Sequence, residues 1–98
     1  MPISEKQRRR LKALAHHLKP VLIVGQNGLT DGVLNEFDIT LETHELVKVR
    51  INAGDREERR AIADSLCKKG SAELVQSIGH VAVFYRRHPE KPKIPTES

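Results

Sequence analysis

The chain has 98 residues, of which 38% are hydrophobic and 31% charged, and its formal net charge is +4 with a pI near 9.5. This length fits one small domain and excludes two independent active domains. The longest apolar runs are too short to cross a bilayer, and no apolar stretch follows the basic N-terminus as a secretory signal requires. We therefore expect a cytoplasmic protein with no membrane partner. The single cysteine, Cys67, excludes an internal disulfide.

A helix and a short strand are predicted first. Ser4 and Gln7 have the spacing of a capping box, and leucines then recur at helical intervals, which predicts an amphipathic helix over residues 4–17 that a Lys-Pro pair ends. The run Val21–Val24 is apolar and rich in β-branched residues. Such a run is typical of a short strand buried on both faces.

Turns that contain glycine separate the next elements. After the turn Gly25–Gly28, Thr30 suits an N-cap and predicts a second helix that runs to about residue 43. Alternating apolar and basic residues predict a strand over 45–51 with one solvated face. A second capping-box spacing predicts a third helix, which Gly70 is expected to cap at its C-terminus.

The last two strands, over residues 72–78 and 81–86, predict a hairpin. The fold class is therefore α/β, a compact single domain with the order α-β-α-β-α-β-β. Helical crossovers favour parallel pairing of the first three strands, and the tight turn makes the last strand antiparallel, so we expect a mixed four-stranded sheet. Residues 1–88 are assigned to the domain and 89–98, rich in Pro and Lys, to a flexible C-terminal tail.

Charge is segregated along the chain. Residues 1–20 carry six basic side chains and one acidic one, whereas residues 21–45 carry five acids and no Lys or Arg. In the first helix, 100° per residue places Arg8, Lys12 and Lys19 along one flank, where they can follow a phosphate backbone. A solvated helix is also normally charged, so both interpretations of the basic helix stay open.

The glycine turn between the first strand and the second helix is a candidate binding loop. A turn that opens a helix presents backbone N–H groups where phosphates bind favourably. Glycines at such turns also serve backbone geometry alone, so the turn by itself decides nothing. Leu29 and Thr30 follow it in place of the Gly-Lys-Ser/Thr of a nucleotide P-loop, which excludes that class of site.

Catalytic and metal sites find little support in the sequence. The five histidines lack ligand spacing, and Cys67 falls beside the core face of its helix, where a thiol is a poor nucleophile. We therefore expect no metal, no cofactor and no enzymatic activity. Only Phe37, Phe84 and Tyr85 are aromatic; Phe37 belongs to the apolar face of a helix, and the other two alternate across one strand. Without a platform for base stacking, recognition of the backbone and shape of folded RNA is favoured.

Four blocks of sequence in order resemble the stand-alone bacterial YhbY-like proteins, which are single-domain members of the CRM family (chloroplast RNA splicing and ribosome maturation). The blocks are Leu18–Val21, Val24–Thr30, His44–Val49, and Ile78–Gly79 with Phe84–Arg86. The resemblance covers residues 4–87. It implies an α/β domain like the C-terminal domain of translation initiation factor three, a Gly-x-x-Gly loop analogous to that of KH domains, and RNA binding without known catalysis.

The same resemblance implies association with large-subunit ribosomal precursors and their rRNA. Its RNA loop would be Gly25, Gln26, Asn27 and Gly28. Many members with several such domains carry a basic residue in this loop, whereas this chain has neutral amides there. Charged contacts are therefore expected from the surrounding basic residues, which are Arg8, Arg9, Lys12, Lys19, Lys48, Arg50 and Arg86.

Two hypotheses for function follow. In the first, a monomer binds structured rRNA of large-subunit precursors and assists ribosome assembly without catalysis, although Asp31 at the start of the second helix opposes a phosphate there. In the second, a protein-interaction module docks on a ribosomal protein through the acidic second helix, with Glu36, Asp38 and Glu42 as contacts. An ordinary solvated helix also explains those acids.

Overall fold

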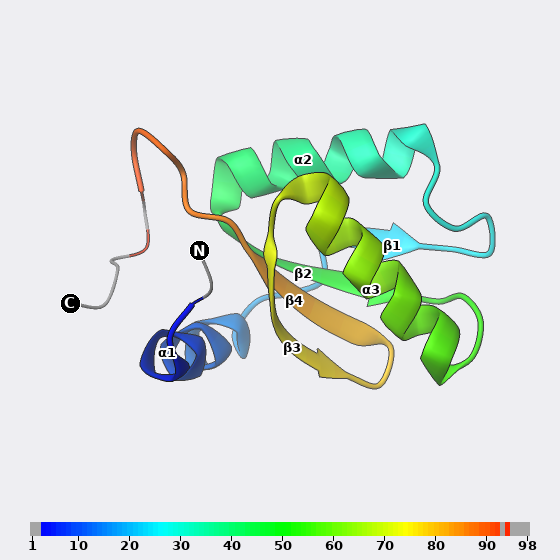
Figure 1. The fold of residues 1–98 in the computed structure, drawn as a ribbon, viewed down its shortest axis with the longest axis horizontal. Coiled ribbons are helices and arrows are strands. Elements are labelled where there is room, and N and C mark those ends of the chain that lie inside the picture. The colour runs from blue at the N-terminus through cyan, green and yellow to red at the C-terminus, as the bar shows by residue number, and fades with distance from the viewer. Residues whose placement is uncertain (1–2, 93, 95–98) are drawn as a thin grey trace.

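The computed structural model describes residues 3–92 and 94. Its elements confirm the predicted order α-β-α-β-α-β-β (Figure 1). They are α1 (Glu5–Ala15), β1 (Leu22–Val24), α2 (Asp31–His44), β2 (Leu46–Ile51), α3 (Arg56–Gly70), β3 (Glu73–Ile78) and β4 (Val81–Tyr85). Within the described ranges, no helix is long and apolar enough to span a membrane.

The four strands form one sheet in the order β1-β2-β4-β3. The predicted mixed four-stranded sheet is confirmed. β1 runs parallel to β2, with Val24 opposite Ile51, while β4 is antiparallel to both of its neighbours. The expected parallel pairing of the first three strands is confirmed only for β1 and β2. It is wrong for β2 and β3, because the tight hairpin returns β4 between them.

Helices cover both faces of the sheet, and each face has its own core (Figure 1). On the face of α2 and α3, the rings of Phe37 and Phe84 meet edge to face with centroids 5.1 Å apart. On the other face, Leu11 and Ala15 of α1 pack against Val83 and other side chains of β2, β3 and β4. The second face is only partly covered, since it carries a single helix.

The predicted N-caps are confirmed at all three helix starts, although the box predicted from Ser4 and Gln7 shows only its Ser4 half among the described contacts. The side chains of Ser4, Thr30 and Asp55 each accept a hydrogen bond from a backbone N–H of the first turn, and Asp55 forms a full capping box with Glu58. These side chains supply acceptors for N–H groups that a helix start leaves unpaired.

The predicted glycine cap of α3 is wrong. Gly70 is the last helical residue, and Ser71 takes the left-handed conformation with φ +51°. Gly70 is needed for another reason, because a Cβ there would lie 2.7 Å from Cε2 of Phe37. The glycine permits α3 to pack closely on α2.

The first strand is an edge strand, and the prediction that both of its faces are buried is wrong. Val24 is fully buried, but Ile23 is 59% exposed and Val21, just before the strand, 54% exposed. The cause is the position of α1, whose core cluster includes side chains from β2, β3 and β4 but none from β1. One face of β1 is therefore left open.

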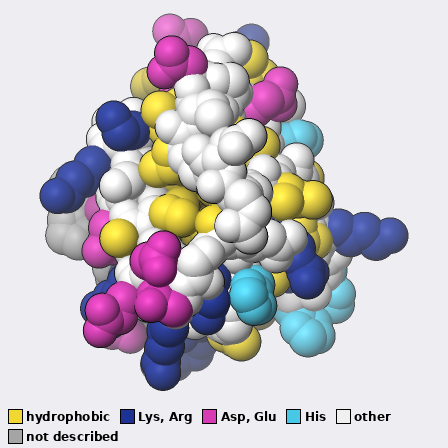
Figure 2. All heavy atoms as spheres, turned by 90° about the vertical axis from the view of Figure 1, so that its right-hand side faces the viewer, with side chains coloured by type: hydrophobic (Ala, Val, Ile, Leu, Met, Phe, Trp, Pro, Cys, Tyr) yellow, Lys and Arg dark blue, Asp and Glu magenta, His cyan; other side chains and the backbone are white. Residues whose placement is uncertain are grey.

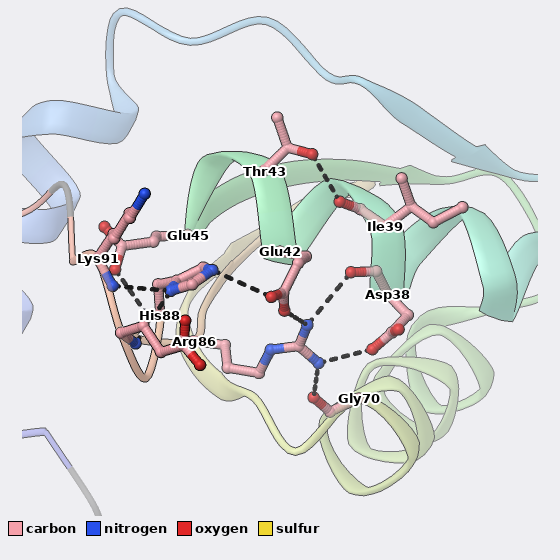
Figure 3. A network of polar contacts seen from close by, with 10 residues as sticks. Asp38, Ile39, Glu42, Thr43, Glu45, Gly70, Arg86, His88 and Lys91 are labelled. Carbon is pink, nitrogen blue, oxygen red and sulfur yellow. Dashed lines mark hydrogen bonds and ion pairs between the residues drawn. The ribbon is translucent and has the colours of Figure 1, made fainter.

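A buried carboxylate, Glu45, holds the chain that follows β4. Its oxygens accept hydrogen bonds from the backbone N–H of His88 at 2.7 Å (Figure 3) and from that of Ile94 at 2.8 Å. Ile94 also packs against the core cluster under α1. Within the flexible tail predicted over 89–98, Ile94 makes one of these hydrogen bonds, and the N–H groups of Glu90 and Lys91 donate to Nδ1 of His88. The remaining tail positions, 93 and 95–98, lie outside the described residues.

Candidate nucleic-acid interface

The Gly25–Gly28 loop forms an open turn at the start of α2. The N–H of Gly28 donates to the carbonyl oxygen of Gly25 at 3.0 Å, and Gly28 has φ +70°, which favours glycine. A Cβ added at Gly25 or Gly28 would meet no atom within 4 Å. The turn conformation explains Gly28, and the space outside the loop is open to a ligand.

Asn52 joins this loop to the end of β2. Its carbonyl oxygen accepts from Nε2 of Gln26 at 3.3 Å, and its side-chain Oδ1 accepts from Nε of Arg50 at 3.2 Å. Its own N–H donates to the carbonyl oxygen of Val24 at 2.8 Å. The loop and the basic side chain of Arg50 are therefore linked through one residue, which the sequence analysis did not single out.

A groove of about 480 Å³ lies on the sheet face beside α1. We call it the basic groove. It brings together three of the predicted RNA contacts, Lys12, Lys48 and Arg50. The other lining residues are Ala15, His16, Pro20, Gln76, Ile78, Val81 and Val83, and no carboxylate is among them.

The cations of the basic groove keep donors available to a ligand. Nζ of Lys48 donates to the carbonyl oxygen of Leu18 at 3.0 Å, which uses one of the three N–H bonds of an ammonium group. Lys12 is exposed on α1. An apolar floor beneath uncompensated cations suits the sugar-phosphate backbone of a nucleic acid.

Two predicted RNA contacts, Arg8 and Arg86, make hydrogen bonds inside the protein. Nη1 of Arg8 donates to the carbonyl oxygens of Leu74 and Val75, which attaches α1 to β3. Neither arginine lines the basic groove. Both hold elements of the fold together, and a role for either in RNA binding stays a prediction.

Arg86 lies at the centre of a polar network between β4, α2 and α3 (Figure 3). Its guanidinium donates to Oδ1 of Asp38 at 2.7 Å, to the carbonyl oxygen of Gly70 at 2.8 Å and to Oε2 of Glu42 at 3.3 Å. Its side chain is only 19% exposed. Sequence alone could not show this, because its partners are distant along the chain.

The acidic helix is partly explained by the same network. Asp38 and Glu42 pair with Arg86, and Oε1 of Glu42 lies 3.0 Å from Nε2 of His88. Glu36 is the third acid suggested as a contact for a ribosomal protein. It is exposed and forms no ion pair within the described chain. Two of the three therefore contribute to the internal structure.

The remaining predicted contacts, Arg9 and Lys19, lie away from the basic groove. Arg9 is exposed on α1. Lys19 borders a second hollow of about 400 Å³, which shares Lys48 with the basic groove and whose other lining is largely apolar, including Leu14 and Leu18. A role for either cation in RNA binding stays a prediction.

The described residues contain no group of three or more His, Cys, Asp or Glu side chains that could hold a metal ion. Burial, with smaller contributions from Asp64 and Glu73, raises the pKa of the Cys67 thiol to about 11. This thiol is protonated at neutral pH and is a poor nucleophile. The rings of Phe37, Phe84 and Tyr85 are buried, and none is exposed for base stacking.

Comparison with known proteins agrees with the resemblance noted above. Residues 3–86 match the family model of the CRS1/YhbY (CRM) domain. The chain belongs to the CRM domain family. It is 47% identical over 93 residues to a Pseudomonas aeruginosa protein named a probable RNA-binding protein, a match that covers 95% of this chain and 89% of that one.

Two further comparisons extend the CRM assignment. A Bacillus subtilis protein, also named a probable RNA-binding protein, is 35% identical over 94% of this chain and 96% of its own. The solution structure of a Staphylococcus aureus protein superposes with a TM-score of 0.84 at 33% identity, covering 97% of this chain and 99% of that one. The predicted family and fold are confirmed.

Three residues that the sequence analysis did not predict as RNA contacts belong to the candidate site: His16 and Gln76 line the basic groove, and Asn52 links it to the loop. Gln76 follows an irregularity in β3 between Leu74 and Gln76, and such a register shift changes which face a side chain occupies. No feature of the sequence marked that irregularity. His16 was noted only as an unsuitable metal ligand.

Proposed function

We propose that this CRM protein binds structured rRNA of large-subunit precursors and assists their assembly, as a cytoplasmic monomer with no catalysis of its own. The observation that carries the proposal is the link through Asn52, which connects the Gly25–Gly28 loop to the basic groove. The names of the relatives, which include an RNA-binding protein of Haemophilus influenzae at 47% identity, support the RNA part of it.

The loop and the basic groove divide the work of binding. The start of α2 offers backbone N–H groups to a phosphate, but Asp31 in its first turn opposes that charge and the loop itself is neutral. Lys12, Lys48 and Arg50 supply the attraction to the backbone and make it dependent on salt. The loop therefore sets the register of the RNA, and the groove provides most of the affinity.

The buried aromatic rings favour a folded RNA ligand. Proteins that hold extended single strands present exposed rings for successive bases. The three rings of this chain lie in its two cores instead, and recognition is left to cations, amides and backbone groups. Such contacts follow the shape and phosphates of paired RNA.

The first test measures Kd for a hairpin fragment of large-subunit rRNA over a series of salt concentrations. The plot of log Kd against log salt should be steep for the unchanged protein. In the double variant Lys12→Gln with Arg50→Gln, the slope should fall by about 2, since each lost phosphate contact removes roughly one unit.

Lys68→Gln with Lys69→Gln is the matched control, because it removes the same charge from exposed positions at the far end of α3. A flat salt dependence of the unchanged protein would rule out the phosphate-contact account. The rRNA part is tested by crosslinking the protein in cells and sequencing the attached RNA. Enrichment of large-subunit precursor rRNA is expected, and its absence would rule out that ligand.

A further inference from the structure

A second basic hollow lies between α3 and the β3–β4 hairpin. We call it the α3 hollow. It measures about 520 Å³, and three arginines within five positions, Arg56, Arg59 and Arg60, line it. Ser77 and Gly79 of the hairpin form the opposite wall. None of these residues was predicted to bind RNA, and none belongs to the basic groove.

The three arginines are not neutralised by nearby acids. In the part of the chain that the structure describes, no carboxylate oxygen lies within 4.0 Å of their guanidinium groups. Glu58 is engaged in the capping box with Asp55, and Asp64 is the one acid in the lining. This differs from Arg86, which has two carboxylates beside it. The α3 hollow therefore keeps an excess of positive charge.

Arg59 is held in place before any ligand arrives. Its Nη1 donates to the carbonyl oxygen of Gly54 at 3.1 Å. Its Nε is buried and has no hydrogen-bond partner among the described residues. A guanidinium fixed by one bond, with donors to spare, loses little conformational freedom when it binds an anion.

The α3 hollow and the Gly25–Gly28 loop are attached to the same short connection. Gln26 donates to the carbonyl oxygen of Asn52, and Arg59 donates to that of Gly54, two residues further along. In Figure 1 the loop, this connection and the start of α3 lie at the same end of the molecule. Figure 2, which faces that end, shows Lys and Arg side chains on both sides of a central area of backbone and hydrophobic groups.

We infer that the α3 hollow is a second phosphate-binding site, so that one folded RNA contacts the protein on both sides of the Gly25–Gly28 loop. The inference rests on the proposed function. Guanidinium groups match the geometry of phosphate oxygens and bind them with two parallel hydrogen bonds. The hydroxyl of Ser77 on the opposite wall is a further donor for the same backbone.

The test compares two double variants of α3 that lose the same charge. Arg56→Gln with Arg60→Gln alters the α3 hollow, and Lys68→Gln with Lys69→Gln is the control at the other end of the helix. The probe is a three-way RNA junction, titrated over a salt series. The first variant should bind about tenfold more weakly, with a slope of log Kd against log salt lower by about 2, and the control should match the unchanged protein.

A second readout follows Arg59 directly and does not depend on a variant. The NMR signal of its Nε–Hε group should shift when the junction RNA is added. Loss of affinity in the Lys12 and Arg50 variant together with unchanged binding in the Arg56 and Arg60 variant would overturn the second site and leave the proposed function standing. No binding by the unchanged protein would remove the proposed function itself.

Discussion

Glycines at different positions of this chain are needed for different physical reasons. Gly28 adopts φ +70° in an open loop, so a side chain there is strained although there is space for it. At Gly70 the constraint is space, because a Cβ would lie 2.7 Å from the ring of Phe37. Gly32, near the start of α2, is subject to neither constraint, since its nearest neighbour would be Oγ1 of Thr30 at 3.8 Å.

This difference predicts opposite effects of the same substitution. Gly70→Ala should lower the free energy of unfolding by about 1–3 kcal/mol, because the methyl group forces α3 away from Phe37. Gly32→Ala should raise it by up to about 1 kcal/mol, because alanine has the higher helix propensity. Urea denaturation of the two variants measures both values. Equal effects of the two substitutions would contradict the packing argument.

Arginines show where prediction from sequence reaches its limit. The helical pattern correctly placed Lys12 on an open flank, and Lys48 and Arg50 on the solvated face of their strand. It could not separate these cations from Arg8, which reaches carbonyl oxygens more than sixty positions away. Local patterns report the direction of a side chain, whereas the partner at its end depends on tertiary contacts.

α1 is attached to the sheet by apolar packing and by one polar anchor. Leu11 and Ala15 are buried against the sheet, and Arg8 adds hydrogen bonds to two backbone carbonyls of β3. Lys12, one turn further along, lines the basic groove and makes no comparable anchor. We therefore expect the same helix to have one residue for stability and another for RNA binding.

Arg8→Gln and Lys12→Gln should separate these two properties. Arg8→Gln should lower the free energy of unfolding by about 1–3 kcal/mol, because two carbonyl groups lose a charged donor. It should leave the salt slope of RNA binding unchanged. Lys12→Gln should lower the salt slope of RNA binding and leave the free energy of unfolding unchanged. Thermal melting and RNA titration of both variants provide the comparison, and a loss of stability confined to Lys12→Gln would contradict the assignment.

Most element boundaries could be predicted because their signals are local. Capping side chains and hydrophobic periodicity placed α1, α2 and α3 within a few residues. The strand order could not be predicted, because it depends on where the hairpin packs relative to β2. The contact of Ile94 with Glu45 was missed for a similar reason, since a polar segment gave no local sign of a distant carboxylate.

The cations of the molecule fall into sets with different connections. The loop and the α3 hollow are both linked to the short connection between β2 and α3, and Arg50 of the basic groove reaches the same connection through Asn52. Arg86, in contrast, pairs with Asp38 and Glu42 in the network that holds α2, α3 and β4 together. Family membership and the Gly-x-x-Gly loop could be predicted from sequence. The second arginine site could not, because its two walls come from α3 and the hairpin and meet only in the folded chain.

The most direct measurement is an NMR titration that follows the backbone amide signals as a structured rRNA hairpin is added. The largest shifts are expected at Gly25–Gly28 and at Lys12, Lys48 and Arg50, with further shifts over 56–60 if the α3 hollow is engaged. Signals of Lys68, Lys69 and the outer face of α2 should stay in place. Shifts confined to the acidic face of α2, with none at the loop or the basic groove, would contradict the account.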